Sequence, residues 1–342
     1  LAAGQRQSVF SLGPLAMTSL PVHDIWTPPV ALLEGRSERE RQQWGRWVLG
    51  SHSDQFIPEM AAAVEGLDQH DPILSGSPIA NPGAWTEDLL VVACQRGRHC
   101  LVVDQPLPCR IVLFDWTGEG LEPGTNPHGW EVISVATECK GQLMQEAWRK
   151  LELPPPGHYM AFLDDDVLIS TAAIQLLLAV ARIHRLSAAQ PAVSFSSSLS
   201  REYGWLRQRV GCALHRVPIV EIMAPFIRRD LLDLVMPFGA GICSGYGVDR
   251  FALPLCAAHL YDWRFAAVDL TPLTHVRSMG SLKTRFSNGL LSKEEELLVR
   301  QRLMRALALP IDEATYHSLE TAAATGSQPA RSKQIRSEQG TC

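Results

Sequence analysis

The sequence contains none of the short signatures that assign an enzyme class directly. It has no glycine-rich phosphate loop and no glycine fingerprint of a dinucleotide-binding fold, which argues against a nicotinamide-dependent enzyme. Its eight cysteines show no CxxC spacing, which argues against a zinc site or a disulfide framework. No apolar run approaches the roughly 18–20 residues that cross a bilayer, so we expect no membrane span in this chain. The function must therefore be sought in polar side chains set among apolar runs.

The chain also lacks an excess of basic residues. Its 342 residues are 46% hydrophobic and 20% charged, with a formal net charge of −5, so we expect no nucleic-acid partner. The length fits one large domain or two smaller ones. Cysteines within apolar runs, such as Cys94 and Cys256, are best explained as buried reduced thiols, which predicts a cytoplasmic protein. Because the first residue is Leu1, a preceding targeting segment stays open.

The chain divides into four parts by composition. The first is rich in proline and glycine around one charged helical pattern, in which Ser37 and Glu40 have the spacing of a capping box. Trp44, Trp47 and Val48 give this helix an apolar stripe. The last residues are small and polar, which predicts a disordered tail. We therefore predict an N-terminal extension, an α/β domain, a C-terminal helical segment and a tail, over residues 1–85, 86–288, 289–321 and 322–342.

In the second part, short apolar runs of strand length alternate with helical patterns. This alternation is typical of an α/β fold with a mostly parallel sheet covered by helices. A charged helix with acidic residues early and arginines late follows it, which suits the helix dipole. The predicted strands are residues 89–94, 110–114, 131–136, 159–163, 192–195, 218–223 and 265–268, and the predicted helices are residues 142–151, 172–183, 228–236, 248–257 and 292–307.

One acidic stretch organises the central domain. Residues 158–170 read HYMAFLDDDVLIS, an apolar run of strand length followed directly by Asp164, Asp165 and Asp166. In open α/β sheets, ligands bind beyond the carboxyl ends of the strands. Carboxylates a few ångströms apart repel one another, so a divalent cation that also binds substrate phosphates would explain their grouping. A solvated acidic turn that starts a helix explains the same three residues equally well.

Two further carboxylates are candidates for acid–base chemistry. Glu221 lies in the apolar run VEIMAP, where a carboxylate is costly unless it is paired or functional. A salt bridge to Arg228 or Arg229 is the structural alternative. Asp249 follows the loop SGYG, whose glycines allow close approach to a ligand and whose Tyr246 offers a stacking face to a sugar ring. Asp249 fits a general base toward an acceptor hydroxyl, and it also fits an ordinary carboxylate at a helix start.

Three other polar residues are candidate ligand contacts. His275 follows an apolar strand-like run, and neutral imidazole binds Mn²⁺-like ions that carboxylates also hold. Lys140 precedes a predicted helix, and Gln190 precedes a predicted strand, so either side chain could contact a diphosphate or a sugar. An ordinary structural role fits each of the three as well.

The end of the acidic strand resembles the Asp-x-Asp motif of GT-A fold glycosyltransferases, which bind a metal ion and a nucleotide sugar. The order of five blocks, within roughly residues 88 to 281, also resembles the domain-of-unknown-function 707 family, glycosyltransferase-like proteins of that fold. The SGYGVD block is similar to the Trp-Gly-x-Glu-Asp loop of inverting galactosyltransferases, except that Tyr246 replaces the tryptophan and one acid remains. The five blocks are FLDDDV (162–167), LSAAQPAVS (186–194), VPIVEIMAPF (217–226), SGYGVD (244–249) and VDLTPLTHVRSMGS (268–281).

The resemblance implies a GT-A-like fold and a transferase that uses Mn²⁺ or Mg²⁺. Asp164 would contact the nucleotide ribose or the metal ion, Asp166 would coordinate the metal ion, and His275 would complete its shell. Asp249, or else Glu221, would deprotonate the acceptor hydroxyl in an inverting reaction. In a retaining reaction, Glu221 would instead face the donor sugar. The other candidate donor contacts are Lys140, Gln190 and Tyr246.

Two other functions are compatible with the same residues. A metal-dependent nucleotidyl or phosphoryl transferase would need similar acidic ligands, although the missing Walker loop disfavours it. A module that binds a nucleotide sugar or carbohydrate without turnover would keep the site but not the chemistry. The expected partners of the transferase are a nucleotide-diphosphate sugar donor and a glycan or other hydroxyl acceptor. Acceptor pockets are built from variable loops, so the sequence does not name the acceptor.

Overall fold

The computed structural model describes residues 37–42, 86–197, 201–260, 262–277 and 285–326. Residues 38–42 are helical, and the predicted capping box at the start of this helix is confirmed. The Ser37 backbone N–H donates to Glu40 Oε2 at 2.8 Å, and the Glu40 N–H donates to Ser37 Oγ at 3.2 Å. The predicted apolar stripe of Trp44, Trp47 and Val48 lies outside the described residues.

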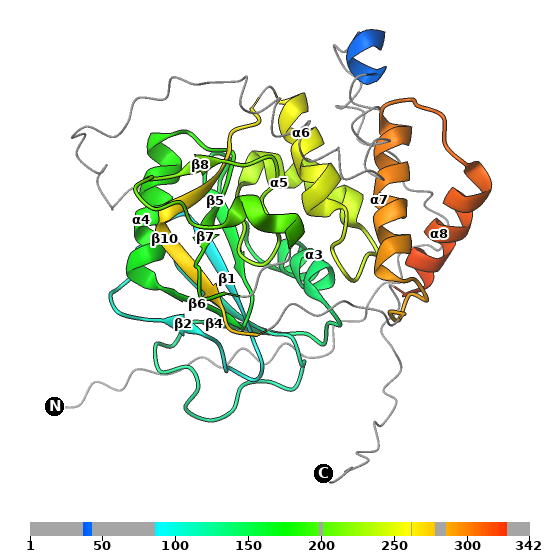
Figure 1. Cartoon of the computed structure of the whole chain (residues 1–342). Helices are drawn as coiled ribbons and strands as arrows, with labels where there is room; N and C mark the ends of the chain where they lie inside the picture. Colours follow the sequence, from blue (N-terminus) through cyan, green and yellow to red (C-terminus); the bar gives the residue numbers. More distant parts are fainter. Residues whose placement is uncertain (1–36, 43–85, 198–200, 261, 278–284, 327–342) are drawn as a thin grey trace, which may run out of the picture.

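A sheet of ten strands forms the centre of the protein (Figure 1). Its strands follow the order β2-β6-β10-β7-β9-β5-β1-β3-β4, and β8 pairs with β10. The strands are β1 (Leu89–Cys94), β2 (Leu101–Val102), β3 (Arg110–Asp115), β4 (Glu131–Ser134), β5 (Tyr159–Leu163), β6 (Val167–Ser170), β7 (Ala188–Val193), β8 (His215–Arg216), β9 (Phe226–Arg228) and β10 (Phe265–His275).

Helices flank the sheet, with α4 on one side and α3, α5 and α6 on the other (Figure 1). The mixed α/β fold class, with a central sheet between helices, is confirmed. The longer helices are α3 (Lys140–Lys150), α4 (Thr171–Ile183), α5 (Arg229–Val235), α6 (Leu253–His259), α7 (Ser292–Ala306) and α8 (Glu313–Gly326), and the shorter helical turns are η4 (Arg201–Leu206), η5 (Met236–Gly239) and the π-helical turn η6 (Val248–Ala252). Among the described residues, none of the helices is long and apolar enough to cross a bilayer.

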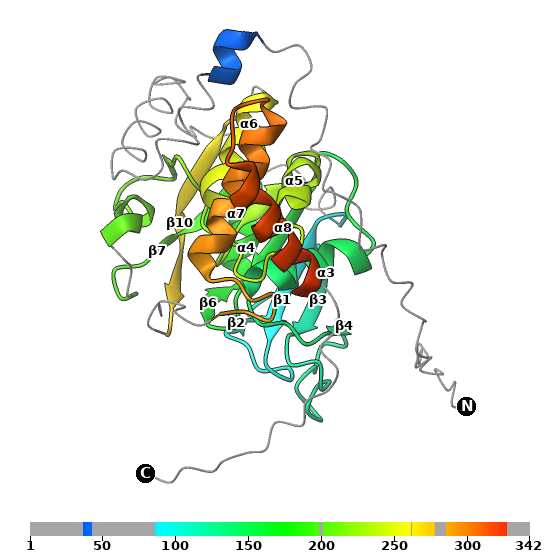
Figure 2. The same ribbon diagram turned by 90° about the vertical axis from the view of Figure 1, so that its right-hand side faces the viewer.

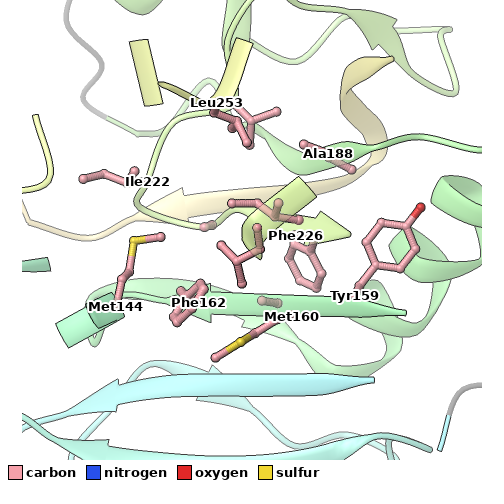
Figure 3. Close-up of a cluster of buried hydrophobic side chains, with 14 of the residues drawn as sticks. Met144, Tyr159, Met160, Phe162, Ala188, Ile222, Phe226 and Leu253 are labelled. Carbon is pink, nitrogen blue, oxygen red and sulfur yellow. The ribbon is translucent and has the colours of Figure 1, made fainter. Parts of the chain in front are cut away.

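The hydrophobic core extends over β5 and the strands and helices around it. All five residues of this strand are buried, as expected for a strand inside a sheet with both faces covered. Figure 3 shows Phe162 of β5 with Met144 of α3 and Phe226 of β9 nearby. Because each fully buried side chain of this size contributes about 1.5–3 kcal/mol, this core fixes the position of β5 and of the acidic residues that follow it.

Besides the edge strand β4, which is parallel to β3, five strands end at the same edge of the sheet. β1, β3 and β5 are parallel neighbours, and the antiparallel β9 lies between β5 and β7. β7 therefore runs in the direction of β5, and β10 is parallel to β7. The residues at or just beyond these carboxyl ends are Cys94, Asp115, Asp164, Ser194 and His275. This edge is where ligands bind in open α/β sheets.

The structure corrects three predicted elements. Residues 218–223 form no strand, although they are buried. The Glu221 N–H donates to the side chain of Gln190, and the Met223 N–H to Glu221, so side chains replace a strand partner there. The strand predicted at 192–195 lies at Ala188–Val193. α8 continues to Gly326, so the predicted disorder is wrong for residues 322–326.

The C-terminal helices are fastened to the rest of the fold by a buried arginine. α8 packs on α7, and α7 packs on η5 and η6; Figure 2 shows α7 and α8 side by side. Arg302 of α7 donates through Nε and Nη2 to Glu320 of α8, both at 2.7 Å. Its Nη1 donates to the carbonyls of Phe238 and Ala240 at 2.9 and 2.7 Å. One side chain thus joins both helices to the turn that leads into the SGYG loop.

Candidate functional site

The candidate site begins directly after β5. Asp164 is held in place by its own backbone, because its N–H donates to the carbonyl of Met223 at 3.0 Å. The Lys140 Nζ lies 2.5 Å from Asp164 Oδ1, and the lysine side chain is only 8% exposed. A buried ammonium that faces one carboxylate leaves part of its donor capacity for another anion. The structure therefore brings together two of the predicted donor contacts, Lys140 and Asp164.

Asp166 faces His275 across the edge of the sheet. His275 Nε2 lies 3.4 Å from Asp166 Oδ1, and the backbone supports this approach because the Val276 N–H donates to the Asp166 carbonyl at 3.0 Å. His275 Nδ1 lies 2.6 Å from the carbonyl of Arg277. A carbonyl only accepts, so Nδ1 carries the proton, and in the neutral ring the lone pair of Nε2 points toward Asp166. The Nε2 lone pair of His275 and the carboxylate of Asp166 thus face each other, and both can coordinate one cation.

Asp165 has a different role from its neighbours. Its carboxylate accepts from the indole Nε1 of Trp116 at 3.3 Å and forms an ion pair with Arg277 at 3.3 Å. Arg277 also offers its carbonyl to His275 Nδ1, so one residue orients both Asp165 and His275. The middle aspartate is therefore neutralised by protein groups, as Asp164 is by Lys140, and both differ in this respect from Asp166, which faces an imidazole.

The residues present fit a divalent cation held by two side chains. Within the described residues, no three His, Cys, Asp or Glu side chains are grouped to hold a metal ion. The predicted ligand set is thus assembled in part: Asp166 and His275 face each other, while Asp164 pairs with Lys140. A carboxylate and an imidazole, joined by substrate phosphates and water, satisfy Mn²⁺ or Mg²⁺, which commonly take few protein ligands at phosphate sites. A hydrogen bond from the outer nitrogen of a metal-binding histidine is the usual support.

Glu221 is buried beside this edge and is not part of a salt bridge to either predicted arginine. Arg228 pairs with Asp230 and Asp262, and Arg229 pairs with Asp233. Glu221 Oε2 instead accepts from the Met223 N–H at 2.6 Å. Gln190 is fully buried, and its Oε1 accepts from the Glu221 N–H at 2.6 Å. The structure therefore uses Gln190 to hold the backbone of Glu221, and it does not place Gln190 on a surface that faces solvent.

The loop that carries Asp249 packs against the start of α3. Gly245 has a φ of +82°, which favours glycine, and a Cβ on Gly141 would lie 2.3 Å from the Gly245 nitrogen. The Gln142 N–H donates to the carbonyl of Cys243 at 3.0 Å. Asp249 follows in the π-helical turn η6, a feature that is frequent at functional sites. Lys140 and Asp249 are thus held on two segments that touch.

Burial changes the acid–base properties of the two inner carboxylates. Burial, with a further contribution from the charge of Asp249, raises the pKa of Glu221 to about 8. Burial raises the pKa of Asp249 to about 6, although Arg250 opposes the shift by its charge and by an N–H bond of 2.7 Å to Oδ1. At neutral pH, Asp249 is therefore ionised and Glu221 is mostly protonated. Two carboxylates with separated pKa values are the usual sign of divided acid and base roles.

Tyr203 and Tyr246 border the same carboxylates. Burial raises the pKa of both phenols, and the charges of Asp249 and Glu221 add to the shift in each case. Tyr246 keeps 37% of its surface exposed, so its ring can face a ligand, as the sequence predicts. The sequence gives no sign of Tyr203, because η4 lies far from the other site residues along the chain.

Glu295 of α7 is a second residue that sequence reasoning misses. It is fully buried and accepts four hydrogen bonds in the SGYG region. The N–H groups of Cys243 and Ser244 donate to it at 2.8 Å each, the Ser244 hydroxyl at 2.5 Å and the Asn288 amide at 2.6 Å. It thereby fixes the loop that leads to Asp249. The only available signal was a glutamate within a charged helix, which ordinarily indicates a solvated face.

Asp115 shows that a carboxylate at this edge can be purely structural. It ends β3, and it accepts from the N–H groups of Arg96, Thr117 and Gly120 and from the Thr117 hydroxyl, at 2.8–3.2 Å. Burial opposes ionisation, but these hydrogen bonds prevail and lower the pKa of Asp115. Its acceptors are engaged by its own turn and by the turn after β1, in contrast to those of Asp166.

The stability of the protein is expected to depend on the charge of Glu221. Its pKa is about 8 in the folded protein against 4.5 ordinarily, so the folded state binds a proton more tightly. Stability therefore falls as the pH rises through this interval. Glu221→Gln retains an acceptor for Met223 and carries no charge. We expect its free energy of unfolding to exceed that of the parent by about 3–5 kcal/mol at about pH 9 and to match it near pH 4, below the ordinary pKa. Urea unfolding of both proteins at both pH values measures this difference in free energy. A difference that does not change with pH would contradict the prediction.

Comparison with known proteins shows similarity of structure alone. No family model and no curated protein matches the chain, so the resemblance to the domain-of-unknown-function 707 family stays a prediction. Similar solved structures include GalNAc-T7 with UDP, GalNAc and Mn²⁺, at 12% identity and a TM-score of 0.40, over 63% of this chain and 48% of that one. Residues 1–349 of TarS from S. aureus, in complex with UDP-GlcNAc, match at 11% identity and a TM-score of 0.37, over 68% and 69% of the two chains.

The match spans about half of the GalNAc-T7 chain. The mixed α/β fold of this chain and the acidic ligand edge of its sheet are seen in its own strands and side chains, described above. Its function is inferred from the same residues.

Proposed function

We propose that this protein is a metal-dependent glycosyltransferase. It moves a sugar from a nucleotide-diphosphate donor to a hydroxyl of a carbohydrate or other acceptor, with Mn²⁺ or Mg²⁺ as cofactor. The proposal rests mainly on one observation: a cation-inviting pair, Asp166 and His275, shares the ligand edge of the sheet with two buried carboxylates, Asp249 and Glu221. Sugar transfer needs both features, because a diphosphate must be neutralised as it leaves and an acceptor hydroxyl must lose a proton.

Donor binding falls to the residues at the end of β5. Asp166 and His275 would hold the metal ion, and Lys140 would add a second positive charge close to Asp164. When bound, the cation acts as a Lewis acid and template for the diphosphate. Asp164 would orient the ribose or the cation, and the exposed ring of Tyr246 would stack on a sugar. Asp165 accepts a hydrogen bond from Trp116 and forms an ion pair with Arg277, and it takes no part in donor binding.

Proton transfer falls to Asp249. In an inverting reaction, the acceptor oxygen forms a bond to the anomeric carbon while the bond from that carbon to the diphosphate oxygen breaks. The acceptor proton passes to a carboxylate, and the products are a glycoside and a nucleoside diphosphate. A base must be ionised before it can accept a proton, and at neutral pH this condition favours Asp249, with a pKa of about 6, over Glu221, with a pKa of about 8. Protonated Glu221 can instead donate a hydrogen bond to the donor sugar.

A thermal-shift panel of nucleoside diphosphates and nucleotide sugars tests the proposal. Each ligand is added with Mn²⁺, with Mg²⁺ or with EDTA. A ligand at a hundred times its dissociation constant stabilises the native state by about 2.7 kcal/mol, so one nucleotide should raise the unfolding temperature by several degrees, and only with metal. Slow release of free sugar from that donor would then separate a transferase from a binding module. The proposal fails if folded protein shows no shift with any ligand, or if EDTA leaves the shift unchanged.

A further inference from the structure

A cavity of about 530 Å³ lies at the other edge of the sheet. Its wall includes Tyr159, which begins β5, whereas Asp164 follows the end of the same strand. Five residues at roughly 3.3 Å each separate the cavity from the candidate site by about 17 Å. The volume falls within the range of ligand pockets. The cavity shares no residue with the candidate site, so binding here and sugar transfer there are separable properties.

Four arginines line this cavity, and they come from three separate parts of the fold. Arg182 and Arg185 lie at the end of α4, Arg228 ends β9, and Arg264 precedes β10. Among the described residues, Asp230 is the only acid in the wall. Guanidinium groups that converge from different directions suit a ligand with several oxygens, because each planar fork can address a different pair.

The acids that hold these arginines lie behind them. Asp88 pairs with Arg182 and is 2% exposed, and Asp262 pairs with Arg228 and Arg264 and is 11% exposed. The arginine side chains are 20–36% exposed at the same pairs. Four arginines against three aspartates leave one positive charge in excess. More importantly, the carboxylates of Asp88 and Asp262 lie on the buried side of the arginines, and the guanidinium groups line the cavity.

The ion pairs fix the guanidinium groups without using all of their donors. Arg228 donates through Nε and Nη2 to Asp230, and Nη2 also lies 2.7 Å from Asp262. Arg264 donates to Asp262 through Nε at 2.5 Å. In the described chain, Nη1 of Arg228 and both terminal nitrogens of Arg264 have no protein acceptor. Donors that are already oriented bind an oxyanion at little entropic cost.

Arg185 is the member of the group with no other evident use. Within the described residues its side chain makes neither an ion pair nor a hydrogen bond, and it is exposed. Its φ is +50°, at the helix end where the Leu186 N–H donates to the carbonyl of Ala181 at 2.8 Å. Glycine is the usual residue in this left-handed position, and another side chain there costs conformational energy. Binding of an anion would explain why an arginine occupies this left-handed position.

We infer that this cavity binds a phosphoryl group, carried either by a free phosphate or phosphate ester or by a phospholipid headgroup. Ion pairs hold the guanidinium groups of Arg228 and Arg264, and that of Arg185 has no partner among the described residues. Together they offer more donors than the two oxygens of a carboxylate can accept, and a tetrahedral phosphate uses them better. The site would act at a distance from the candidate transfer site, at the opposite end of β5.

Calorimetric titration in EDTA, which silences the metal-dependent site, tests this inference. The probes are inorganic phosphate, and phosphatidylcholine vesicles with and without phosphatidic acid. Arg185→Ala removes a side chain without partners among the described residues, so we expect it to leave the fold intact and to weaken binding about tenfold or more. Arg264→Ala should have a similar effect, since Asp262 keeps Arg228. The matched control is Arg149→Ala, an exposed arginine of α3 paired with Glu146, which should change affinity less than about twofold.

The two probes distinguish the sources of the phosphoryl group. Binding of inorganic phosphate that depends on Arg185 supports a free phosphate or ester. Binding confined to vesicles with phosphatidic acid, and equally dependent on Arg185, supports a headgroup. The inference is overturned if neither probe binds, or if Arg149→Ala weakens binding as much as Arg185→Ala does.

Discussion

Asp166→Ala is expected to lose metal-dependent donor binding while the protein stays folded. Asp166 and His275 face each other at 3.4 Å, so the carboxylate supplies half of the protein ligands that the proposal assigns to the cation. Changes to groups that merely support a metal ligand cost 10- to 100-fold in affinity, so loss of a ligand should cost about 100-fold or more. The fold should survive, because the Asp166 carbonyl still accepts the Val276 N–H and one carboxylate fewer lies near Asp164. Calorimetry with the nucleotide that responds in the thermal-shift panel measures the loss.

Asp165→Asn is the matched control for this experiment. It alters the neighbouring residue of the same turn, and the amide can still accept from Trp116 Nε1. We expect metal-dependent donor affinity within a few fold of the parent protein. Equal loss in the two variants would show that the whole acidic turn matters and would sink the specific assignment of Asp166. Unfolding of Asp166→Ala in EDTA below the temperature of the parent would point to a structural role.

Asp249→Asn is expected to abolish transfer and to leave donor binding intact. Asparagine keeps the shape of the side chain but cannot accept the acceptor proton, and a positioned general base contributes about 10²- to 10⁴-fold to the rate. In the parent protein, kcat should rise with pH through about 6 as the Asp249 carboxyl ionises. The residual activity of the variant should lack this rise. Initial rates across the pH range and donor titrations of both proteins provide the measurement.

Glu221→Gln separates the two candidate bases. If Asp249 is the base, Glu221→Gln should retain the rise of kcat near pH 6, because a protonated glutamic acid and a glutamine both donate hydrogen bonds. If Glu221 were the base, this variant would lose transfer and Asp249→Asn would keep it. Loss of donor binding in Asp249→Asn would place that residue at the donor and contradict its assignment to the acceptor.

The sequence predicted the elements whose pattern is local. Runs such as Leu89–Cys94 and Tyr159–Leu163 are wholly apolar because both faces of the sheet are covered, and their boundaries agree with the structure. The segment around Glu221 has the same composition, but the N–H groups of Glu221 and Met223 donate to side chains, those of Gln190 and Glu221, and it forms no strand. A partner that lies 31 residues away in the chain leaves no mark on the local pattern.

The candidate site was predictable only in part, for a similar reason. Asp164 and Asp166 stand out because they follow an apolar strand, and Asp249 because glycines precede it. The pairing of Lys140 with Asp164, which diverts one predicted metal ligand, depends on how α3 meets β5. Glu295 and Tyr203 reach the site from distant segments, and neither lies in a motif. Whether a carboxylate binds a ligand or, like Asp115, its own turn is decided by backbone conformation that composition does not encode.

The hydrogen bonds that Glu295 accepts from the SGYG region extend the structural unit of this protein beyond the predicted domain boundary. A boundary at residue 288 falls between Asn288 and Glu295, both of which serve the loop before Asp249. A shortened chain that stopped there would keep every strand of the sheet and every proposed ligand of the cation. It would nevertheless leave the N–H groups of Cys243 and Ser244 without their acceptor, next to the residue assigned to proton transfer. The C-terminal helices therefore belong to the same structural unit as the sheet, because Glu295 of α7 holds the loop that leads to Asp249.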